Sequence, residues 1–350
     1  MNRNRPTILD VAQRAGVSVG TVSNVLNDAI RVSEKRRLRV LKAIKELGYS
    51  QNLLAQGLRK RRSTMVGLCV PHTSSSYFAA LVNMFEEIAS DRGFELLQVV
   101  SRHDPKKEME RVEALLKYKI GGLILIPSLE PEKTLKLVVQ SGTPLVVVDR
   151  PTANLRYDQV TFDNRGAMFE ATRHLIALGH RRILFIVRQR GLLVTKHRIE
   201  GLFDAVRKSG GKATAEVFES GFDEVSLTAR LSEDFRKPLP PTAVIVSNSL
   251  FAAWAMRAFR SLKIKYPEDV SLLCFDEPDW ADLVTPQLSV VRQPHEAIAR
   301  RAWEFLIRRM TNEFEGAQRE QLKAEVIFRD SIQPVADDAT QARRPRKPRK

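Results

Sequence analysis

Residues 7–49 read TILDVAQRAGVSVGTVSNVLNDAIRVSEKRRLRVLKAIKELGY, and their pattern predicts three short helices. Thr7 and the aspartate three residues later form a capping box ahead of apolar residues at helical spacing, and Gly16 ends this first helix. Ser18 can cap a second helix over about residues 19–26, and a third follows in the second half of the stretch. Two short helices joined by a turn that contains glycine have the geometry of a helix-turn-helix.

The second helix has the composition of a helix that reads DNA. Its apolar side, with Val22 and Val25, must pack on the first helix. Its other side carries Val19, Gly20, Thr21, Ser23, Asn24 and Asn27. Hydroxyl groups can bind phosphates and set the register, and an asparagine can bind a base edge in the major groove. Taken alone, the same composition also fits a short polar helix that binds nothing.

The positive charge of the chain is concentrated at its two ends. Residues 1–62 hold fourteen Lys/Arg and four Asp/Glu, and residues 341–350 hold six Lys/Arg and no acid. The remaining residues are neutral in sum, although the whole chain carries +16. Such local fields attract a polyanion by releasing its counterions. The C-terminal run of cations and prolines cannot bury apolar area, so we expect residues 335–350 to be a disordered basic tail.

Residues 7–49 resemble the headpiece of the LacI/GalR family of transcription regulators, through the elements VAxxAGVSxxTVSxVLN, VSE and LGY. The resemblance implies that Val19, Gly20 and Asn24 read bases and that the hydroxyl residues contact phosphates or support the helix. The full set for which we predict DNA contacts is Thr7, Ser18, Val19, Gly20, Thr21, Ser23, Asn24, Asn27, Ala55, Leu58 and Arg59.

Residues 51–64 correspond to the family's hinge, which the resemblance implies becomes helical only on DNA. There Leu58 would enter the minor groove as an apolar wedge, and Arg59 would contact a phosphate. Gln51 stands where the family usually has proline, and Gly57 where it usually has serine. A plain flexible linker is the alternative reading of this segment.

From Met65 onward, short aliphatic strands alternate with amphipathic helices, which predicts parallel sheets covered on both faces. The number of units suits two sheets better than one. The strands are expected at residues 66–70, 95–100, 122–126, 145–148, 160–162, 183–187, 243–246 and 272–275, and helices at 79–91, 106–118, 165–178, 196–209 and 250–261.

Polar residues follow several of these strands, where open α/β sheets bind ligands. They are residues 71–78, Asp149-Arg150, Asp163-Asn164, residues 188–198, Ser247-Asn248 and Asp276-Glu277. Each of them singly also fits a cap or a turn. Together they predict a polar cleft suited to a hydroxyl-rich or charged small molecule.

The resemblance extends through the body to about Pro334, in segments such as VDRP, HRIEGLFDAV and PTAVIVSNS. It implies a periplasmic-binding-protein-like core of two lobes, with the chain crossing between them near Asp163, Gln293 and residue 320. The residues that would hold an effector are Tyr77, Phe78 and Phe222 as apolar or stacking walls, and Asp149, Arg198, Asn248 and Asp276 as polar anchors.

Three departures from the family pattern put a standard sugar pose in question. Ser249 stands where many relatives have aspartate, Trp254 replaces a frequent glycine, and the loop before Arg198 reads GLLVT, which is more apolar than usual. A sugar or sugar derivative remains the effector that we expect, and loss of effector binding is the alternative.

The expected fold is an all-α helix-turn-helix headpiece on an α/β periplasmic-binding-protein-like body of two parallel-sheet lobes. The expected boundaries are residues 1–50 for the headpiece, 51–64 for the hinge, 65–334 for the body and 335–350 for the tail. Within the body we expect lobe 1 at about 65–162 and 293–320, and lobe 2 at about 163–292 and 321–334.

These features predict a cytoplasmic transcription regulator, a repressor that binds a palindromic DNA operator as a homodimer and responds to a small-molecule effector. No late leucine heptads appear, so we expect a dimer rather than a coiled-coil tetramer. We also expect no secretory signal, no membrane partner and no cofactor. Cys69 and Cys274 lie alone in apolar runs and form no metal or disulfide pattern.

An enzyme is disfavoured because no GxSxG, P-loop, HExxH or GxGxxG motif is present. The alternative function is a cytosolic sugar-binding protein without an operator.

Overall fold

The computed structural model describes residues 6–26, 32–49, 63–152, 156–313 and 316–335. The chain divides into two compact units, residues 1–62 and 63–350, which we call the head and the body. Among the described residues, no helix is both long enough and apolar enough to cross a membrane.

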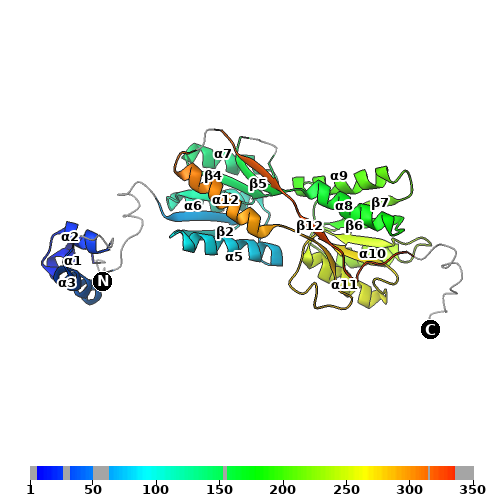
Figure 1. Ribbon diagram of the computed structural model, residues 1–350, viewed down its shortest axis with the longest axis horizontal. Helices are drawn as coiled ribbons and strands as arrows, with labels where there is room; N and C mark the ends of the chain where they lie inside the picture. The colour runs from blue at the N-terminus through cyan, green and yellow to red at the C-terminus, as the bar shows by residue number, and fades with distance from the viewer. Residues whose placement is uncertain (1–5, 27–31, 50–62, 153–155, 314–315, 336–350) are drawn as a thin grey trace. The chain divides into compact units, whose positions relative to one another are not determined.

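The described part of the head holds three helices, α1 (Ile8–Ala15), α2 (Val19–Leu26) and α3 (Glu34–Leu47), which confirms the predicted helix-turn-helix (Figure 1). The predicted capping box is present, because the Asp10 amide donates to the Thr7 hydroxyl and the Thr7 amide donates to the Asp10 carboxylate at 2.6 Å. Gly16 ends α1 with a left-handed backbone at φ 61°, a conformation that glycine adopts without strain. The head has its own apolar core, formed by Val11, Ala12, Ala15, Val22, Val25, Val40 and Ala43.

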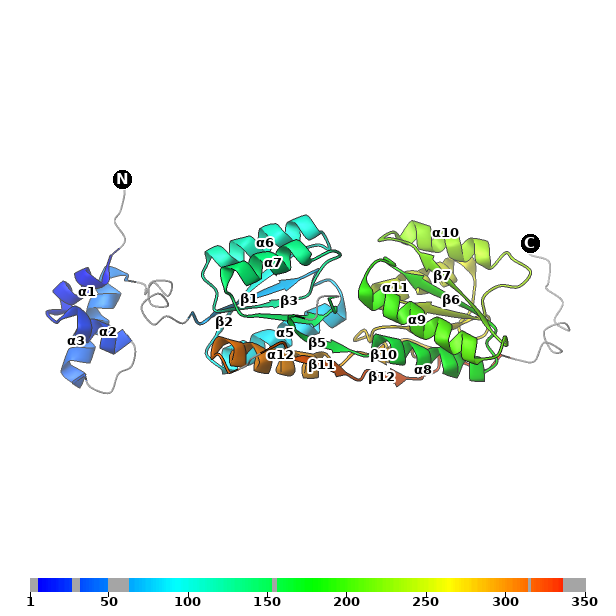
Figure 2. The same cartoon turned by 90° about the horizontal axis from the view of Figure 1, so that it is seen from above.

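The first lobe of the body is a six-stranded, fully parallel sheet with the order β11-β5-β4-β3-β1-β2. Helices cover both faces, with α5 and α12 on one and α6 and α7 on the other (Figure 2). The strands are β1 (Met65–Val70), β2 (Glu95–Val100), β3 (Gly122–Leu125), β4 (Leu145–Asp149), β5 (Asp158–Phe162) and β11 (Arg319–Leu322). The helices are α5 (Ser76–Asp91), α6 (Pro105–Lys117), α7 (Glu132–Ser141) and α12 (His295–Met310).

The second lobe is a six-stranded sheet with the order β12-β10-β9-β8-β6-β7, in which only β12 is antiparallel. Helices α8 and α9 cover one face, and α10 and α11 cover the other (Figure 1). The strands are β6 (Arg182–Val187), β7 (Thr214–Glu219), β8 (Ala243–Val246), β9 (Ser271–Cys274), β10 (Ser289–Arg292) and β12 (Glu325–Ile327). The helices are α8 (Asn164–Ala177), α9 (Leu193–Lys208), α10 (Glu224–Asp234) and α11 (Ser249–Leu262).

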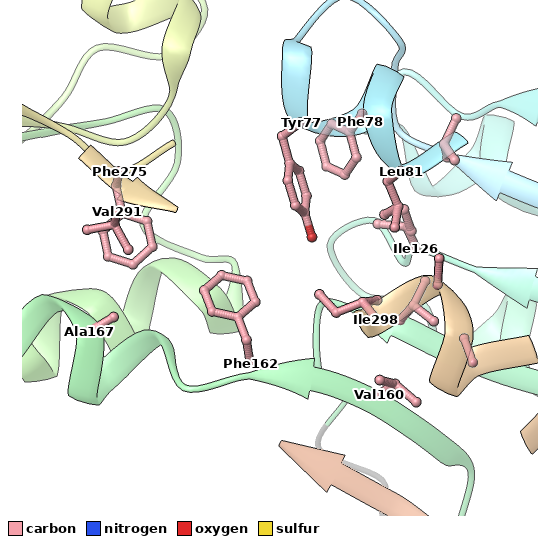
Figure 3. Close-up of a cluster of buried hydrophobic side chains, with 14 of the residues drawn as sticks. Tyr77, Phe78, Leu81, Ile126, Val160, Phe162, Ala167, Phe275, Val291 and Ile298 are labelled. Atoms are coloured by element: carbon pink, nitrogen blue, oxygen red, sulfur yellow. The ribbon is translucent and has the colours of Figure 1, made fainter. Parts of the chain in front are cut away.

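The described chain passes between the lobes at three points: after β5, after β10, and between β11 and β12. The first two match the positions expected near Asp163 and Gln293. The third lies at residues 323–324 rather than near 320, because β11 continues its pairing with β5 through Leu322. One apolar cluster spans the passages; in it Phe162 and Phe275 lie with ring centroids 6.4 Å apart (Figure 3).

Four short strands were not among those expected: β7, β10, β11 and β12. Three of them are edge strands, and their sequences TAEVFE, REQL and EVI mix charges with apolar residues. An edge strand has one free side and tolerates charge, so it lacks the aliphatic run that marks a central strand.

Helices α8 and α9 pack closely against each other at Gly201, the glycine of the HRIEG motif. A Cβ atom at Gly201 would collide with the backbone oxygen of Arg165 and would lie 3.0 Å from the backbone nitrogen of Phe169. Both opposing atoms belong to the α8 backbone, so only a shift of a whole helix could make room.

We therefore expect Gly201→Ala to lower the free energy of unfolding of the body by about 1–3 kcal/mol, the usual cost of overpacking. Urea unfolding followed by tryptophan fluorescence measures this, because Trp254, Trp280 and Trp303 all lie in the body. Gly20→Ala is the control, since its nearest neighbour is the Ser18 hydroxyl at 3.7 Å. Equal midpoints for the two variants would show that the helices are not in tight backbone contact.

Candidate functional site

The face of α2 that is predicted to read DNA lies mostly outside the head's core, although Val19 packs against the edge of that core. Val22 and Val25 are buried against the other helices. The described residues with predicted DNA contacts lie elsewhere: Ser18, Gly20 and Asn24 are exposed, and Val19, Thr21 and Ser23 are half-buried. The accessible surface of this helix therefore carries the Asn24 amide beside Gly20, which has no side chain.

Two of these residues also build the start of α2. The Ser18 side chain accepts the Thr21 amide at 3.2 Å, and the two hydroxyls lie 3.0 Å apart. Thr7 has a comparable local role as the cap of α1, with its hydroxyl 2.7 Å from the Asp10 carboxylate. The predicted DNA contacts of Asn27, Ala55, Leu58 and Arg59 lie outside the described residues.

Arg39 of α3 braces the turn of the helix-turn-helix. Its Nε donates to the Ala15 carbonyl at 2.9 Å, and its Nη2 donates to the Gly16 carbonyl at 2.7 Å. These carbonyls belong to the C-terminal end of α1, where backbone acceptors lack helical partners. A guanidinium there satisfies the acceptors and complements the helix dipole, so the angle between α1 and α3 depends on this contact. Sequence reasoning did not single out Arg39.

In the body, all seven residues predicted to hold an effector line one cavity of about 90 Å³ between the lobes. They are Tyr77, Phe78, Asp149, Arg198, Phe222, Asn248 and Asp276. Most come from the carboxyl ends of strands, where the parallel sheets of both lobes leave their loops. The structure thus brings together residues that are up to 199 positions apart in the chain.

Arg198 is the buried cation of this cavity. Its Nε donates to Asn164 Oδ1 at 2.7 Å, its Nη1 donates to the Ser247 carbonyl at 3.1 Å, and its guanidinium lies 3.8 Å from the Phe275 ring centroid. Burial lowers the Arg198 pKa to about 10, and the charges of Asp149 and Asp276 oppose this shift. Two hydrogen bonds and an aromatic face hold the side chain in one orientation.

Tyr77 and Asp149 form a buried pair on the wall from the first lobe. The Tyr77 hydroxyl donates to Asp149 Oδ1 at 2.8 Å, and Figure 3 shows the Tyr77 hydroxyl oxygen at the end of the ring that points away from its helix. Burial raises the pKa of Asp149, and the Arg150 charge and the Tyr77 hydrogen bond oppose the rise. Asp149 has φ 63°, a left-handed backbone that is rare for a residue other than glycine. This local strain turns the chain sharply at the end of β4.

Three further predicted residues lie on the wall from the second lobe. Asp276 is buried, and burial raises its pKa to about 6 against hydrogen bonds from Ser249. Asn248 caps α11, because its Oδ1 accepts the Phe251 amide at 3.0 Å. Phe222 is 59% exposed, so its ring can meet a ligand at the mouth of the cavity.

Seven other residues also line the cavity: His72, His103, Arg150, Arg188, Thr195, Ser247 and Gln293. Five of them fall within the strand-end positions that were predicted to form a polar cleft, and His103 and Gln293 do not. Arg150 and Arg188 directly follow the strands β4 and β6, which is the position from which the polar cleft was predicted. The two histidines follow β1 and β2, and their rings lie 5.0 Å apart. Burial, Arg150 and Arg188 lower the pKa of His72 to about 4 and that of His103 to about 2.

Comparison with known protein families gives two matches. Residues 7–52 match the family "Bacterial regulatory proteins, lacI family". Residues 172–332 match the "Periplasmic binding protein-like domain". The first match falls on the head, and the second falls within the body.

Individual proteins agree with this division. The chain is 32% identical over 302 residues to the HTH-type transcriptional regulator GalR of Escherichia coli (strain K12), which covers 86% of this chain and 88% of GalR. It is 29% identical to the transcriptional regulator CelR solved as a complex with cellobiose, with a TM-score of 0.69 over 93% of this chain and all of that one. The Lac repressor dimer bound to operator and the anti-inducer ONPF shares the fold, with 22% identity, a TM-score of 0.82 and coverage of 94% and 100%.

The contacts of Arg39 predict that Arg39→Met loosens the head, because two carbonyls at the end of α1 lose their donor. We expect a loss of about 1–3 kcal/mol in local stability, and faster backbone hydrogen exchange in residues 7–26 of the full-length protein. Hydrogen-exchange mass spectrometry measures this, and exchange in the body should not change.

Arg36→Met is the matched control, since Arg36 is exposed on the same helix and its side chain has no hydrogen bond or ion pair with the described residues. If the two variants exchange equally, Arg39 does not brace the turn.

Proposed function

Because the chain belongs to the LacI family of bacterial regulatory proteins, we propose that it binds a palindromic DNA operator as a homodimer under the control of a sugar or sugar derivative. Membership of the family makes it a DNA-binding transcription regulator. The operator symmetry, the dimer, the sense of repression and the effector class are the proposed parts.

The observation that carries the proposal is the division of α2 into two faces. Val22 and Val25 are buried in the head's core, while Gly20 and Asn24 are exposed. A major groove admits a helix only if the side chains facing the bases are free of intramolecular contacts. Asn24 is the exposed side chain of α2 with both a donor and an acceptor, so we assign it the main role in choosing a base.

The cavity between the lobes supports a hydroxyl-bearing effector. It combines aromatic walls, Phe78 and Phe222, with the buried polar groups of Asp149, Arg198 and Asp276. Carbohydrate sites need both features, because a sugar ring has apolar faces and hydroxyl edges. The relative CelR was solved with cellobiose, which supports a carbohydrate-like ligand for this chain.

Dimerisation through the second lobe is supported by an apolar surface there. Leu283 is 79% exposed and adjoins Val284, which lines a surface hollow. Apolar residues of this hollow are Met256, Ile264 and Trp280, and charged residues of α11 border them. We assign this surface, the α11 surface, to a second copy of the chain, because the Lac repressor neighbour was solved as a dimer bound to operator. Two-fold symmetry would bring two heads to the two halves of a palindrome.

Control by the effector would act through the passages between the lobes. Ion pairs link the segments there: Arg292 pairs with Glu277 at 3.1 Å and with Glu325 at 3.1 Å, and Arg329 pairs with Glu277 at 2.5 Å. A ligand that contacts both lobes favours one relative orientation of the lobes over another. Linkage then requires that DNA change the affinity for the effector by the same factor as the effector changes the affinity for DNA.

The function is tested by selecting random duplex DNA with the full-length protein at about 0.15 M salt, where charge alone retains little DNA. The protein should enrich a palindrome. Asn24→Ala should relax the preference at one position of each half-site and weaken operator binding by about 1–3 kcal/mol per head.

Asn83→Ala, an exposed asparagine of α5, is the matched control and should keep the full preference. Enrichment of no sequence by the full chain would contradict the operator and favour a sugar-binding protein without one. An unchanged preference in Asn24→Ala would contradict the assignment of Asn24.

The α11 surface predicts that Leu283→Glu separates the copies, because burying a carboxylate in an apolar interface is costly. Sedimentation should then report a monomer, and operator binding should weaken because the two heads no longer bind as a unit. Val139→Glu on α7 of the first lobe, 56% exposed, serves as the control and should remain dimeric. A Leu283→Glu protein that still sediments as a dimer would place the interface elsewhere.

A further inference from the structure

Four basic side chains gather at one end of the cavity between the lobes: His72, His103, Arg150 and Arg188. Nη2 of Arg150 lies 3.3 Å from Nδ1 of His103, and the rings of His72 and His103 are 5.0 Å apart. We call these four residues the basic end of the cavity. None of them belongs to the set that the family resemblance predicted.

The charge of Arg150 is compensated by neighbouring groups of the protein. Its Nη1 donates to the Pro127 carbonyl at 3.0 Å, and its Nε lies 3.8 Å from Asp149 Oδ2. The carboxyl of Glu108 adds to the negative field around it. Arg150 is therefore a buried cation held in place by its surroundings.

The charge of Arg188, in contrast to that of Arg150, is not compensated by neighbouring carboxylates. Its guanidinium lies 4.8 Å from the Phe222 ring centroid, and within the described part of the chain it has no hydrogen bond and no carboxylate partner. Burial and the like charge of Arg150 lower the Arg188 pKa to about 10. A half-buried cation beside another cation costs free energy in the empty protein, so a ligand that supplied negative charge would relieve this cost.

His103 adds an unused donor. Its Nδ1 can only accept from Arg150, because a guanidinium has no acceptor, so the neutral ring carries its proton on Nε2. Nε2 is buried and has no hydrogen-bond partner among the described residues. His72 is held by Ser74, whose hydroxyl lies 3.0 Å from Nδ1. The basic end thus offers an oriented N–H beside two guanidinium groups.

The acids of the cavity do not balance the arginines. Arg150, Arg188 and Arg198 line it together with two carboxyls, Asp149 and Asp276. Asp149 is engaged by Tyr77 and Arg150, and Asp276 by Ser249. The uncompensated positive charge therefore lies at the Arg188 side.

We propose that the effector carries an anionic group, a carboxylate or a phosphate, which binds at the basic end between Arg150 and Arg188 and accepts from His103. The inference rests on the proposed function, since it takes this cavity as the effector site. The hydroxyl groups of the same molecule face Arg198, Asp149 and Asp276. An acidic sugar, either a sugar acid or a sugar phosphate, fits this division, because guanidinium forks bind both anions. A neutral sugar would leave the charge of Arg188 unpaired.

The test uses the full-length protein and its melting temperature, followed by tryptophan fluorescence, at constant ionic strength made up with chloride. The probes are D-glucose, D-gluconate, D-glucose 6-phosphate and inorganic phosphate. Arg188→Met removes the charge and keeps the apolar stem. Arg111→Met is the matched control, because Arg111 is exposed on α6 and has no partner among the described residues.

In chloride alone, Arg188→Met should melt at a higher temperature than the parent, since an unpaired cation has been removed, and Arg111→Met should not. At least one anionic probe should raise the melting temperature of the parent more than glucose does. This shift should be retained in Arg111→Met and lost in Arg188→Met, with the affinity reduced about tenfold or more. The larger of the gluconate and glucose 6-phosphate shifts identifies the anion.

A lower melting temperature of Arg188→Met in chloride would overturn the proposal, because Arg188 would then be a structural residue. Glucose stabilising the parent as much as every anionic probe would also overturn it, as would an anion shift that survives in Arg188→Met. The DNA selection is a separate readout. Anion binding without operator selection would overturn the operator function and leave the anion site standing.

Discussion

Both sheets of the body direct their carboxyl ends at one cavity, and this arrangement depends on the passages of the chain between the lobes. A parallel sheet leaves its ligand-binding loops at one edge only. Because β5, β10 and β11 each end where the chain enters the other lobe, the two edges face each other. Tyr77 and Asp149 come from one edge, and Arg198 and Asp276 come from the other. The site exists only as long as this pairing of edges does.

The side chains that line the cavity hold one another in place through hydrogen bonds and ion pairs. Asp149 accepts from Tyr77 and lies beside Arg150, and Arg198 is held by two hydrogen bonds and the ring of Phe275. Buried charges of this kind are costly unless they are paired, so removing one member affects the others. Arg188 is the exception, and it gives the site an unmet demand for negative charge. The acidic effector that we propose rests on this unpaired charge, because electrostatics would favour an anionic ligand over a neutral one.

The head and the effector cavity differ in how far the sequence could predict them. In the head, Thr7, Gly16 and the apolar spacing act within a few residues of the chain, and the structure has the helices where they were expected. In the cavity, the seven predicted residues came from a family pattern, and they do line one space. The role of Arg39 could not be predicted, because its hydrogen-bond partners lie 23 and 24 residues away in the sequence and no local pattern marks such a contact.

The sequence by itself determined the three-helix head, the alternation of strands and helices, and the concentration of charge at the ends, because these follow from local spacing and composition. Only the tertiary structure decided that His72, His103, Arg150 and Arg188 share one end of a cavity, and that Arg188 alone among its arginines lacks a polar partner in the described chain. Pairing of charges depends on distances between residues far apart in sequence. The sequence does not contain these distances, because they are set only when the two sheets fold and the passages between the lobes bring their edges together.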